Sequence, residues 1–371
     1  MCIRDSLVDL YVLERTNWDK VKKLTSYDRL IIDNEYVLPP FKILPTIYSR
    51  VVHWFTRDLA GAYIIKNRKH DLLIATKQLL VPTFVDVLYM HFPIFLPGFE
   101  YLYYPDRYLY NSFLRIYSRP LELVTKMLIT LFKNLENKPL ILTNSRFSAT
   151  IIERFLGVKA LVLYPPVDIE KYLPLSRNRN RENIVVTVSR IDPEKNLDVV
   201  LEVAKEVRRA KFIIMGTIGS YNYYLHLIKK LKDLKLKDRV KIMPNVNEKL
   251  KIEVLKRAKI YLHPMKYEHF GIAVVEAMAA GLVPVVHKSG GPWIDIVELS
   301  KYGVGYKSIE ELIEGINYLL CNRSTWLSIA SKTPEKAKQY SQKHFKSRLS
   351  SILTVLQAHK CRSKSSVNRV N

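Results

Sequence analysis

The sequence predicts an α/β protein made of two Rossmann-like domains, each a doubly wound parallel sheet with helices on both faces. The chain has 371 residues, which is too long for one ordinary core and suits two domains. Hydrophobic residues make up 48% and charged residues 25% of it, as in packed globular domains. Its second half alternates short β-branched runs with amphipathic helical segments, which is the pattern of a parallel sheet covered by helices.

The second half contains the more complete set of these elements. Residues 184–189 (IVVTVS) are expected to form a strand, and residues 196–209 a helix that places Leu197, Val200 and Leu201 on one face. Similar patterns predict strands at 211–215, 240–243, 260–263 and 283–286, and helices at 247–258 and 271–280. We therefore expect a complete domain of the nucleotide-binding type over residues 184–340.

The first half, residues 1–165, shows similar but less regular units. Strands are expected at residues 9–13, 29–32, 72–75, 85–89 and 140–143. Residues 121–135 (LELVTKMLITLFKNL) have an amphipathic helical pattern with lysines on the polar side. Only Gly61, Gly98 and Gly157 of the twelve glycines precede residue 166, so the first strand and glycine-rich turn with which such domains usually begin are missing. We therefore expect a truncated N-terminal domain.

Three other segments complete the predicted organisation. Residues 166–183 combine prolines with a polar, basic run and are expected to link the two domains. Residues 341–357 predict a C-terminal helix that returns toward the N-terminal domain, and residues 358–371 a basic tail. Residues 79–99 are long and apolar enough to suggest a membrane span, but Asp86, His91 and three prolines favour a buried strand followed by a loop.

The charge balance and the missing motifs restrict the function. Lys and Arg number 59 against 35 Asp and Glu, a formal charge of +24 that predicts attraction to nucleic acid, a lipid surface or phosphorylated small molecules. Cys2, Cys321 and Cys361 lie far apart without a C-x-x-C pair, which argues against a disulfide framework or zinc site and favours a reducing cytoplasm. No D-x-D, H-E-x-x-H or Walker A motif occurs, so we expect a site without metal or cofactor.

Two glutamates indicate the site. Glu276 is the only charged residue in the apolar stretch 270–286, and Glu268 lies eight positions before it. An unpaired buried carboxylate is costly, so Glu276 needs a polar partner. The predicted helix start near Phe270, Gly271 and Ile272 offers free N–H groups to a diphosphate or sugar oxygen, and Glu276 is placed to accept hydrogen bonds from a ribose diol. The alternative is a structural ion pair between Glu276 and a lysine from a neighbouring strand, and the spacing does not decide between the two.

Two cations point to the same place. Arg190 directly follows the strand at 184–189, and Lys195 comes five residues later in SRIDPEKN. In open parallel sheets ligands lie outside the carboxyl ends of the strands, where two cations can clamp a diphosphate and neutralise a leaving group. The alternative for both residues is ordinary surface charge.

His91 ends the strand-like run VDVLYMH and precedes Phe92 and Pro93. A histidine at the carboxyl end of a strand that faces an interdomain cleft can contact the sugar or help to position the acceptor. A buried histidine of the core fits the sequence equally well.

Together these residues resemble the retaining family-4 glycosyltransferases, which have the GT-B fold of two facing Rossmann-like domains. The E-x7-E motif of the family resembles Glu268 and Glu276, and its phosphate-binding Arg/Lys pair resembles Arg190 and Lys195. The resemblance is closer to the α-1,2-mannosyltransferases that extend lipid-linked oligosaccharide in N-glycan assembly. It rests there on residues 263–281 (HPMKYEHFGIAVVEAMAAG), 287–297 (HKSGGPWIDIV), 164–168 (YPPVD), 142–152 (LTNSRFSATII) and 91–93 (HFP).

The resemblance implies a role for each of these residues, with GDP-mannose as the donor. Arg190 and Lys195 would hold the diphosphate, Glu276 the ribose, and Glu268 with the amides around Phe270, Gly271 and Ile272 the transferred sugar. His91 would lie beside the reacting carbon. The base would be flanked by Gly216, Pro244, Asn245 and Val246. Retention without an obvious nucleophile implies that the departing diphosphate assists the acceptor hydroxyl on the same face.

The resemblance also implies a lipid-linked glycan acceptor and a peripheral position at the cytosolic face of a membrane. Cationic patches and the helix at 121–135 would meet an anionic surface there. The alternative is that this helix packs wholly inside the N-terminal domain. The glycine-rich loop and the N-terminal membrane-anchoring helix of the eukaryotic relatives have no counterpart, which leads us to expect a longer reading frame upstream.

Other functions fit less of the sequence. The same fold can use a UDP-sugar, another GDP-sugar or a soluble acceptor. A nucleic-acid-binding protein would explain the basic charge, but the chain lacks a helix-turn-helix, zinc-finger or RNP signature, so we expect no nucleic acid partner. A GT-B phosphorylase would need a pyridoxal-lysine motif, which is missing, and GT-B epimerases lack the E-x7-E pattern.

Overall fold

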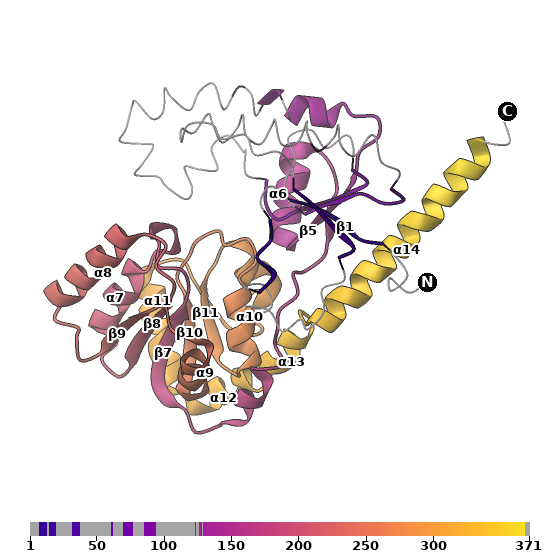
Figure 1. Cartoon of the computed structure of the whole chain (residues 1–371). Coiled ribbons are helices and arrows are strands. Elements are labelled where there is room, and N and C mark those ends of the chain that lie inside the picture. The colour runs from indigo at the N-terminus through magenta and orange to yellow at the C-terminus, as the bar shows by residue number, and fades with distance from the viewer. Residues whose placement is uncertain are drawn as a thin grey trace.

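The computed structural model describes residues 7–12, 15–19, 32–37, 61, 70–76, 85–93, 123, 126, 127 and 129–367. They form two domains, as Figure 1 shows: a C-terminal domain that contains β7 to β12, and an N-terminal domain that contains β1 to β6. A long C-terminal helix, α14, extends from the first domain along the second.

The N-terminal domain contains two parallel sheets in its described part. One consists of β1 (Asp9–Val12) and β2 (Asn34–Val37), and the other has the order β3-β4-β5-β6. The strands of the second sheet are β3 (Ile74–Ala75), β4 (Val87–Met90), β5 (Leu140–Thr143) and β6 (Leu161–Val162). Helix α6 (Arg146–Leu156) connects β5 to β6, and its apolar side buries Ile152 against this sheet.

The C-terminal domain is built on one six-stranded parallel sheet of order β12-β11-β10-β7-β8-β9. Its strands are β7 (Glu182–Val188), β8 (Lys211–Gly216), β9 (Val240–Pro244), β10 (Ala258–His263), β11 (Val283–His287) and β12 (Val304–Tyr306). The chain adds β8 and β9 on one side of β7, then returns and adds β10, β11 and β12 on the other side. The winding direction therefore reverses between β7 and β10.

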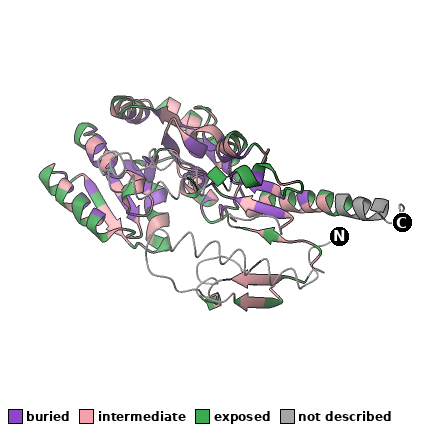
Figure 2. Ribbon diagram, turned by 90° about the horizontal axis from the view of Figure 1, so that it is seen from above, coloured by how far each residue is buried: buried purple, intermediate pink, exposed green. Residues whose placement is uncertain are grey.

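Helices cover both faces of this sheet, because successive strand residues point to opposite sides. Val185 of β7 lies in the core on one face, and Ile184 and Val186 lie in the core on the other. The first face carries α7 (Asp198–Glu206), α8 (Tyr221–Asp233), α11 (Ile309–Cys321) and α12 (Arg323–Ala330). The second carries α9 (Glu248–Arg257), α10 (Ile272–Ala279) and α13 (Thr333–Lys338). Figure 2 shows the buried residues gathered in the sheet and the exposed ones on the outer helices.

Three short turns of helix complete the domain. Two are 3-10 turns, η3 (Leu173–Arg177) and η4 (Pro193–Lys195), and the third is a π-helical turn, η5 (Pro292–Ile296). Turns of π-helix are rare and frequently occur at functional sites. η5 follows β11, and its residues belong to the segment HKSGGPWIDIV.

The chain crosses between the domains at two places that lie side by side. The first crossing passes through Val167, and Tyr172 just beyond it is buried in the C-terminal domain. The second leads from Tyr340 into α14 (Gln342–Val367), whose Ile352 packs with β4 and β5 of the N-terminal domain. The N–H of Val167 donates to the carbonyl of Tyr340 at 2.9 Å, and Val167 forms a parallel bridge with Ser341.

The predicted parallel α/β architecture is confirmed, and the strands β7 to β11 begin and end within two residues of the predicted ranges. The differences include β2, the strand β12, which has no predicted counterpart, and the C-terminal end of the chain. The strand expected at 29–32 falls largely outside the described residues, and β2 forms at Asn34–Val37 instead. Residues 1–6, 79–84 and 94–99, which include Gly98, also lie outside them. α14 continues to Val367, into the segment that the sequence assigned to a tail.

The described residues of the segment 121–135 are helical as far as Lys133. Phe132 is buried in the core of the N-terminal domain. Leu123, Met127 and Leu131 are spaced by four residues and are 67%, 62% and 53% exposed. This helix is therefore not packed wholly inside the domain. Within the described part of the chain, no helix is long and apolar enough to cross a membrane.

Candidate functional site

The residues singled out by the sequence meet where the winding of the C-terminal sheet reverses. In parallel sheets of this kind, the loops after the two central strands diverge and leave room for a ligand. Here the central strands are β7 and β10. The loop after β7 carries Arg190 and Lys195, and the loop after β10 carries Glu268. The topology thus brings together Lys195 and Glu268, which are 73 positions apart in the chain.

Glu268 is held by a lysine and a histidine. Its Oε2 accepts a hydrogen bond from Nζ of Lys195 at 2.9 Å and lies 3.5 Å from Nε2 of His263, and its Oε1 accepts the backbone N–H of His269 at 3.1 Å. Burial alone would raise the pKa of this carboxyl, but His263 and Lys195 outweigh burial and hold the pKa well below its usual range. Glu268 is therefore a buried anion at neutral pH.

Glu276 also has a lysine partner. Nζ of Lys251, on α9, lies 2.8 Å from Oε2 of Glu276 and donates to the hydroxyl of Tyr172 at 2.7 Å. The side chains of Lys251 and Glu276 are 14% and 16% exposed. This is the structural ion pair that the sequence left open, except that the lysine comes from a helix and not from a strand. Because both side chains keep some exposure, the pair does not close the position to a ligand.

Arg190 turns toward its own loop. Its Nη2 pairs with Glu194, its Nε lies 3.9 Å from Oδ2 of Asp192, and its side chain is 51% exposed. Asp192 and Glu194 are the nearest carboxylates along the chain, so they compete for this guanidinium. Of the two cations that the sequence assigns to a diphosphate, the structure places Lys195 against Glu268 and pairs Arg190 with Glu194, whose Oε1 also lies 3.9 Å from Nζ of Lys195.

The residues predicted to flank a base form one turn. Gly216 at the end of β8 pairs in register with Pro244 at the end of β9, and the N–H of Asn245 donates to the carbonyl of Gly216 at 2.8 Å. Val246 packs against the core behind them. A Cβ on Gly216 would lie 1.7 Å from the carbonyl oxygen of Ser189, so only glycine fits beside the loop that follows β7.

The start of α10 presents backbone rather than side chains. Gly271 precedes the helix with φ of 100°, a conformation that favours glycine, and Ile272 is 49% exposed. The ring of Phe270 is buried and meets the ring of Tyr340 edge-on, with 5.4 Å between centroids. Phe270 can therefore contribute its amide to a ligand, but its ring belongs to the packing near the domain crossing.

The segment SGG after β11 supports the loop that carries Glu268. The N–H of Gly291 donates to the carbonyl of Glu268 at 2.8 Å, and Oγ of Ser289 accepts the N–H of Tyr267 at 2.9 Å. A Cβ on Gly290 would lie 2.4 Å from the same Glu268 carbonyl oxygen. The close approach of these two backbones requires glycine and fixes where Glu268 stands.

His91 reaches the site from the N-terminal domain. It follows β4 and is exposed, and its ring meets Tyr89 edge-on at 4.9 Å. The next residue, Phe92, stacks on His269 of the Glu268 loop, with ring centroids 3.9 Å apart and an interplanar angle of 3°. Burial lowers the pKa of His269 to about 4, so its ring is neutral at pH 7. His91 therefore stands one residue before the ring that contacts the Glu268 loop of the other domain.

Sequence reasoning missed four polar residues of this region: Lys251, His263, His269 and Asp295. Lys251 lies on the same side of α9 as the buried Val254 and Leu255, one turn earlier. Asp295 stands alone in the apolar run WIDIV, which is the criterion that singled out Glu276. His263 is the last residue of β10, so it lies at the carboxyl end of a strand, as His91 does after β4. Each of these signals was available in the pattern of the chain.

Among the residues that the structure describes, no three His, Cys, Asp or Glu side chains come together as a metal site. The positive charge that the site offers is that of lysine and arginine side chains.

Comparison with known proteins agrees with this geometry. Residues 168–344 match the family model described as Glycosyl transferases group 1. Two similar proteins are both named GDP-Man:Man(3)GlcNAc(2)-PP-Dol alpha-1,2-mannosyltransferase. The one from Dictyostelium discoideum is 24% identical over 287 residues, 69% of this chain and 56% of that protein. The one from Neurospora crassa is 30% identical over 243 residues, 55% of this chain and 43% of that protein. The chain thus spans about half the length of these relatives.

The fold comparison covers more of the chain. The crystal structure of HepE from Anabaena in complex with UDP superposes with a TM-score of 0.64 at 18% identity, over 94% of this chain and 92% of that one. A similarity at this level concerns the fold, and it extends through the N-terminal domain. The predicted GT-B fold is therefore confirmed, and within it residues 168–344 are similar to the group 1 glycosyl transferase family model.

Proposed function

We propose that the protein is a retaining glycosyltransferase that moves mannose from GDP-mannose to a lipid-linked oligosaccharide and forms an α-1,2 linkage. The observation that carries this proposal is the meeting of Lys195 and Glu268 at the reversal point of a parallel sheet, where Phe92, the neighbour of His91 in the other domain, stacks on His269. The names of the relatives from Dictyostelium discoideum and Neurospora crassa support the choice of donor and acceptor.

The donor would lie along the carboxyl edge of the C-terminal sheet. The base would rest against the turn of Gly216 and Asn245, and the ribose hydroxyls would donate to Glu276, which they would share with Lys251. The diphosphate would reach Lys195, and Arg190 would exchange Glu194 for a phosphate oxygen. Breaking the ion pair with Glu194 would need little free energy, because half of the Arg190 side chain is in solvent, where ion pairs contribute little.

The transferred sugar would then lie between Glu268 and His91. Glu268 is an acceptor with no proton to give at neutral pH, which suits it to hydrogen bonds from sugar hydroxyls. Lys195 can stabilise the negative charge that develops on the leaving diphosphate, so the proposed chemistry uses no metal ion. The leaving diphosphate would assist the acceptor hydroxyl on the same face of the sugar, which gives retention.

The test is an assay of the full chain with GDP-mannose and a lipid diphosphate that carries Man(3)GlcNAc(2). We expect a product one hexose heavier by mass spectrometry, an α-anomer by NMR, and loss of at least 100-fold in rate for Glu268→Gln. Titration with GDP, UDP and ADP should rank GDP first. Tighter binding of UDP, or transfer only from a UDP-sugar, would overturn the proposed donor.

We propose further that the protein works as a peripheral enzyme at the cytosolic face of a membrane. The exposed stripe of Leu123, Met127 and Leu131 would enter the interfacial region of the bilayer, next to the exposed lysines Lys126 and Lys133. The formal charge of +24 favours an anionic leaflet. A lipid-linked acceptor would be presented at that same surface.

A further inference from the structure

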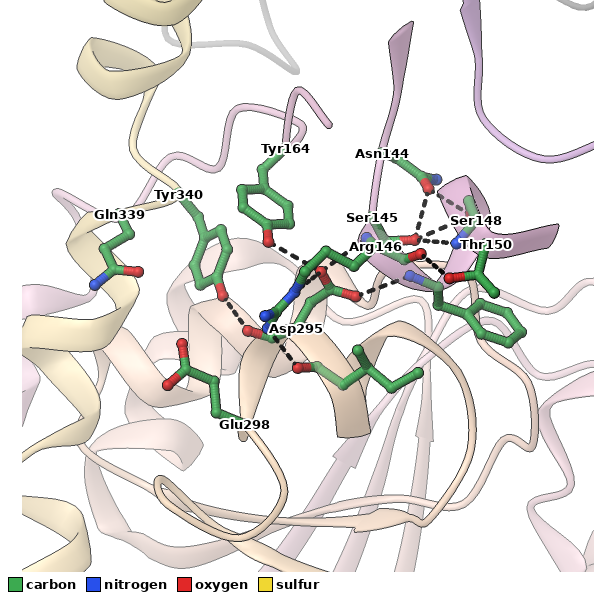
Figure 3. Close-up of polar contacts among 12 residues, drawn as sticks. Asn144, Ser145, Arg146, Ser148, Thr150, Tyr164, Asp295, Glu298, Gln339 and Tyr340 are labelled. Carbon is green, nitrogen blue, oxygen red and sulfur yellow. Dashed lines mark hydrogen bonds and ion pairs between the residues drawn. The ribbon is translucent and has the colours of Figure 1, made fainter. Parts of the chain in front are cut away.

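Asp295 is a buried residue of the C-terminal domain. The hydrogen-bond donors to its carboxylate all come from the N-terminal domain or from the crossings between the domains. Asp295 lies in η5 and is fully buried. Its Oδ1 accepts hydrogen bonds from the backbone N–H of Arg146 at 2.8 Å, from Nε of Arg146 at 3.2 Å and from the hydroxyl of Tyr164 at 2.9 Å. Its Oδ2 accepts the backbone N–H of Phe147 at 3.4 Å. Figure 3 shows these side chains converging on Asp295.

These contacts cap a helix of one domain with a carboxylate of the other. Arg146 and Phe147 are the first two residues of α6, whose N–H groups have no partner within the helix. Ser145 caps the third free group, because its Oγ accepts the N–H of Ser148 at 3.0 Å. Asp295 supplies the acceptor for the two groups that Ser145 leaves, and its negative charge lies at the positive end of the helix dipole.

Two more hydrogen bonds hold the backbone at Asp295. Nη2 of Arg146 donates to the carbonyl of Ile294 at 2.7 Å, and the hydroxyl of Tyr340 donates to the carbonyl of Asp295 at 2.6 Å. Burial, and then the charge of Asp295, raise the pKa of Tyr164, so the phenol remains a hydrogen-bond donor. Both oxygens of the carboxylate are therefore hydrogen-bonded, and the carboxylate itself is fully buried and closed to a substrate.

In each domain, a residue near this contact has a polar contact with the backbone of a residue of the proposed site. On the N-terminal side, the hydroxyl of Ser148 lies 3.2 Å from the carbonyl oxygen of His91 and 2.8 Å from Oδ1 of Asn144, and it can donate to either. On the C-terminal side, Gly291 lies four residues before Asp295 and donates its N–H to the carbonyl of Glu268 at 2.8 Å. A single buried contact thus connects the backbone that carries His91 with the backbone that carries Glu268.

We infer that Asp295 is a positioning residue, which sets the relative placement of His91 and Glu268 by fixing α6 to the C-terminal domain. It does not touch the substrate. The inference rests on the proposed transfer reaction, and it accounts for the segments LTNSRFSATII and SGGPWIDIV, which supply the two halves of the contact. Without Asp295, each half of the site keeps its own geometry, but the distance between the halves is no longer fixed.

The test compares Asp295→Asn with Glu298→Gln, a control at the next turn whose carboxylate forms its ion pair with Lys336 of α13. For Asp295→Asn we expect a fall in kcat of at least 10-fold and a Kd for GDP within 3-fold of the parent, because the donor contacts lie within the C-terminal domain. Glu298→Gln should change neither. An unchanged kcat, or a loss of GDP affinity that equals the loss of kcat, would overturn the inference.

A second readout does not depend on activity. Spin labels at Glu153→Cys on α6 and Glu314→Cys on α11, in a background with the three cysteines replaced by serine, report the distance between the domains. Asp295→Asn should broaden this distribution, and Glu298→Gln should not. If Asp295→Asn fails to fold, Arg146→Ala serves, because it removes part of the contact from a half-exposed position. An unchanged distribution in both variants would refute the inference whether or not the protein transfers mannose.

Discussion

Nζ of Lys251 lies 2.8 Å from Oε2 of Glu276, and Nζ of Lys195 lies 2.9 Å from Oε2 of Glu268, so each glutamate of the E-x7-E pair has its own lysine. These lysines come from different elements, the first from α9 and the second from the loop after β7. The chain can bury both carboxylates because both are paired. We expect the two pairs to respond differently to substitution, and the difference would separate a structural role from a binding role.

Glu276→Gln is expected to weaken GDP binding by about 10- to 100-fold, because an amide replaces a charged acceptor of the ribose hydroxyls. Isothermal titration with GDP measures the change. Glu248→Gln is the matched control, since Glu248 belongs to the same network through Tyr172 and Lys251 but is half-exposed on the outside of it. Equal affinity in the parent and in Glu276→Gln would leave this glutamate with a structural role alone.

Lys251→Met should act on stability. The substitution keeps the length of the side chain but leaves Glu276 as a largely buried anion without its cation, and we expect the free energy of unfolding to fall by about 1–3 kcal/mol. Urea denaturation measures it. Lys249→Met, on the exposed side of α9, should lose less than about 0.5 kcal/mol. A stable Lys251→Met variant would mean that solvent or backbone already satisfies Glu276.

Glu268 should make stability sensitive to acid. Its pKa in the folded protein is lowered, against an unfolded value of about 4.3, so its stabilising contribution is present above that value and is lost as the pH falls below it. Glu268→Gln should therefore show a smaller loss of stability between pH 5 and pH 3 than the parent. Urea unfolding across this range measures the slope, and Glu314→Gln on the exposed face of α11 should match the parent.

His269 should produce a second pH dependence at higher pH. The folded protein holds its pKa at about 4 and the unfolded chain at about 6.5, so the unfolded state binds the proton first and stability falls as the pH drops between these values. Between pH 7 and pH 5 this contribution is about 2 kcal/mol. His269→Phe keeps the stack on Phe92 and should lose less stability than the parent over this interval. An equal loss of stability in the parent and in His269→Phe would mean that another group binds the proton on unfolding.

Gly290→Ala should disturb the loop that carries Glu268. Gly290 has φ of 77°, and a Cβ there would lie 2.4 Å from the Glu268 carbonyl oxygen, so the backbone must shift. We expect a loss of about 1–3 kcal/mol in stability together with weaker transfer. Gly315→Ala is the control, because a Cβ there meets only a valine methyl at 3.1 Å. Wild-type activity in Gly290→Ala would show that this contact does not set the position of Glu268.

The exposed stripe on the helix at 121–135 should govern membrane binding. Replacing Leu123, Met127 and Leu131 with serine should reduce co-sedimentation with vesicles that contain anionic lipid by at least 10-fold, because the apolar area that enters the bilayer is lost. Serine substitutions at Tyr221 and Leu225, which are exposed on α8, are the control. Binding that ignores both the anionic lipid and the stripe would rule out this surface.

The sequence anticipates the C-terminal domain well because its signals are local. Residues 184–187 of β7, for example, are β-branched and buried, and glycines stand where the backbone needs them, as at Gly271. The Lys195–Glu268 contact was also accessible, since the ends of parallel strands meet at one edge of a sheet. The contacts of Arg190 with Asp192 and Glu194 were not anticipated, because sequence spacing does not reveal where a side chain turns, and its role toward a diphosphate stays a prediction.

What the sequence did not yield depends on contacts between distant segments. The pairing of Glu276 with Lys251 requires the orientation of α9 against α10, and the pairing of Asp295 with α6 requires the arrangement of the two domains. A lone acidic residue in an apolar run signals that a partner exists, but it does not identify the partner. For Glu276 the sequence left a lysine and a ribose open, and the structure supplies the lysine while the ribose remains a prediction.

The two crossings between the domains are hydrogen-bonded to each other through Val167 and Tyr340. The hydrogen bond is joined by a parallel bridge between Val167 and Ser341, so the two crossings form one connected unit. A break in the backbone at either crossing would leave the halves tethered by the other. Any change in the arrangement of the domains would therefore have to move both crossings together.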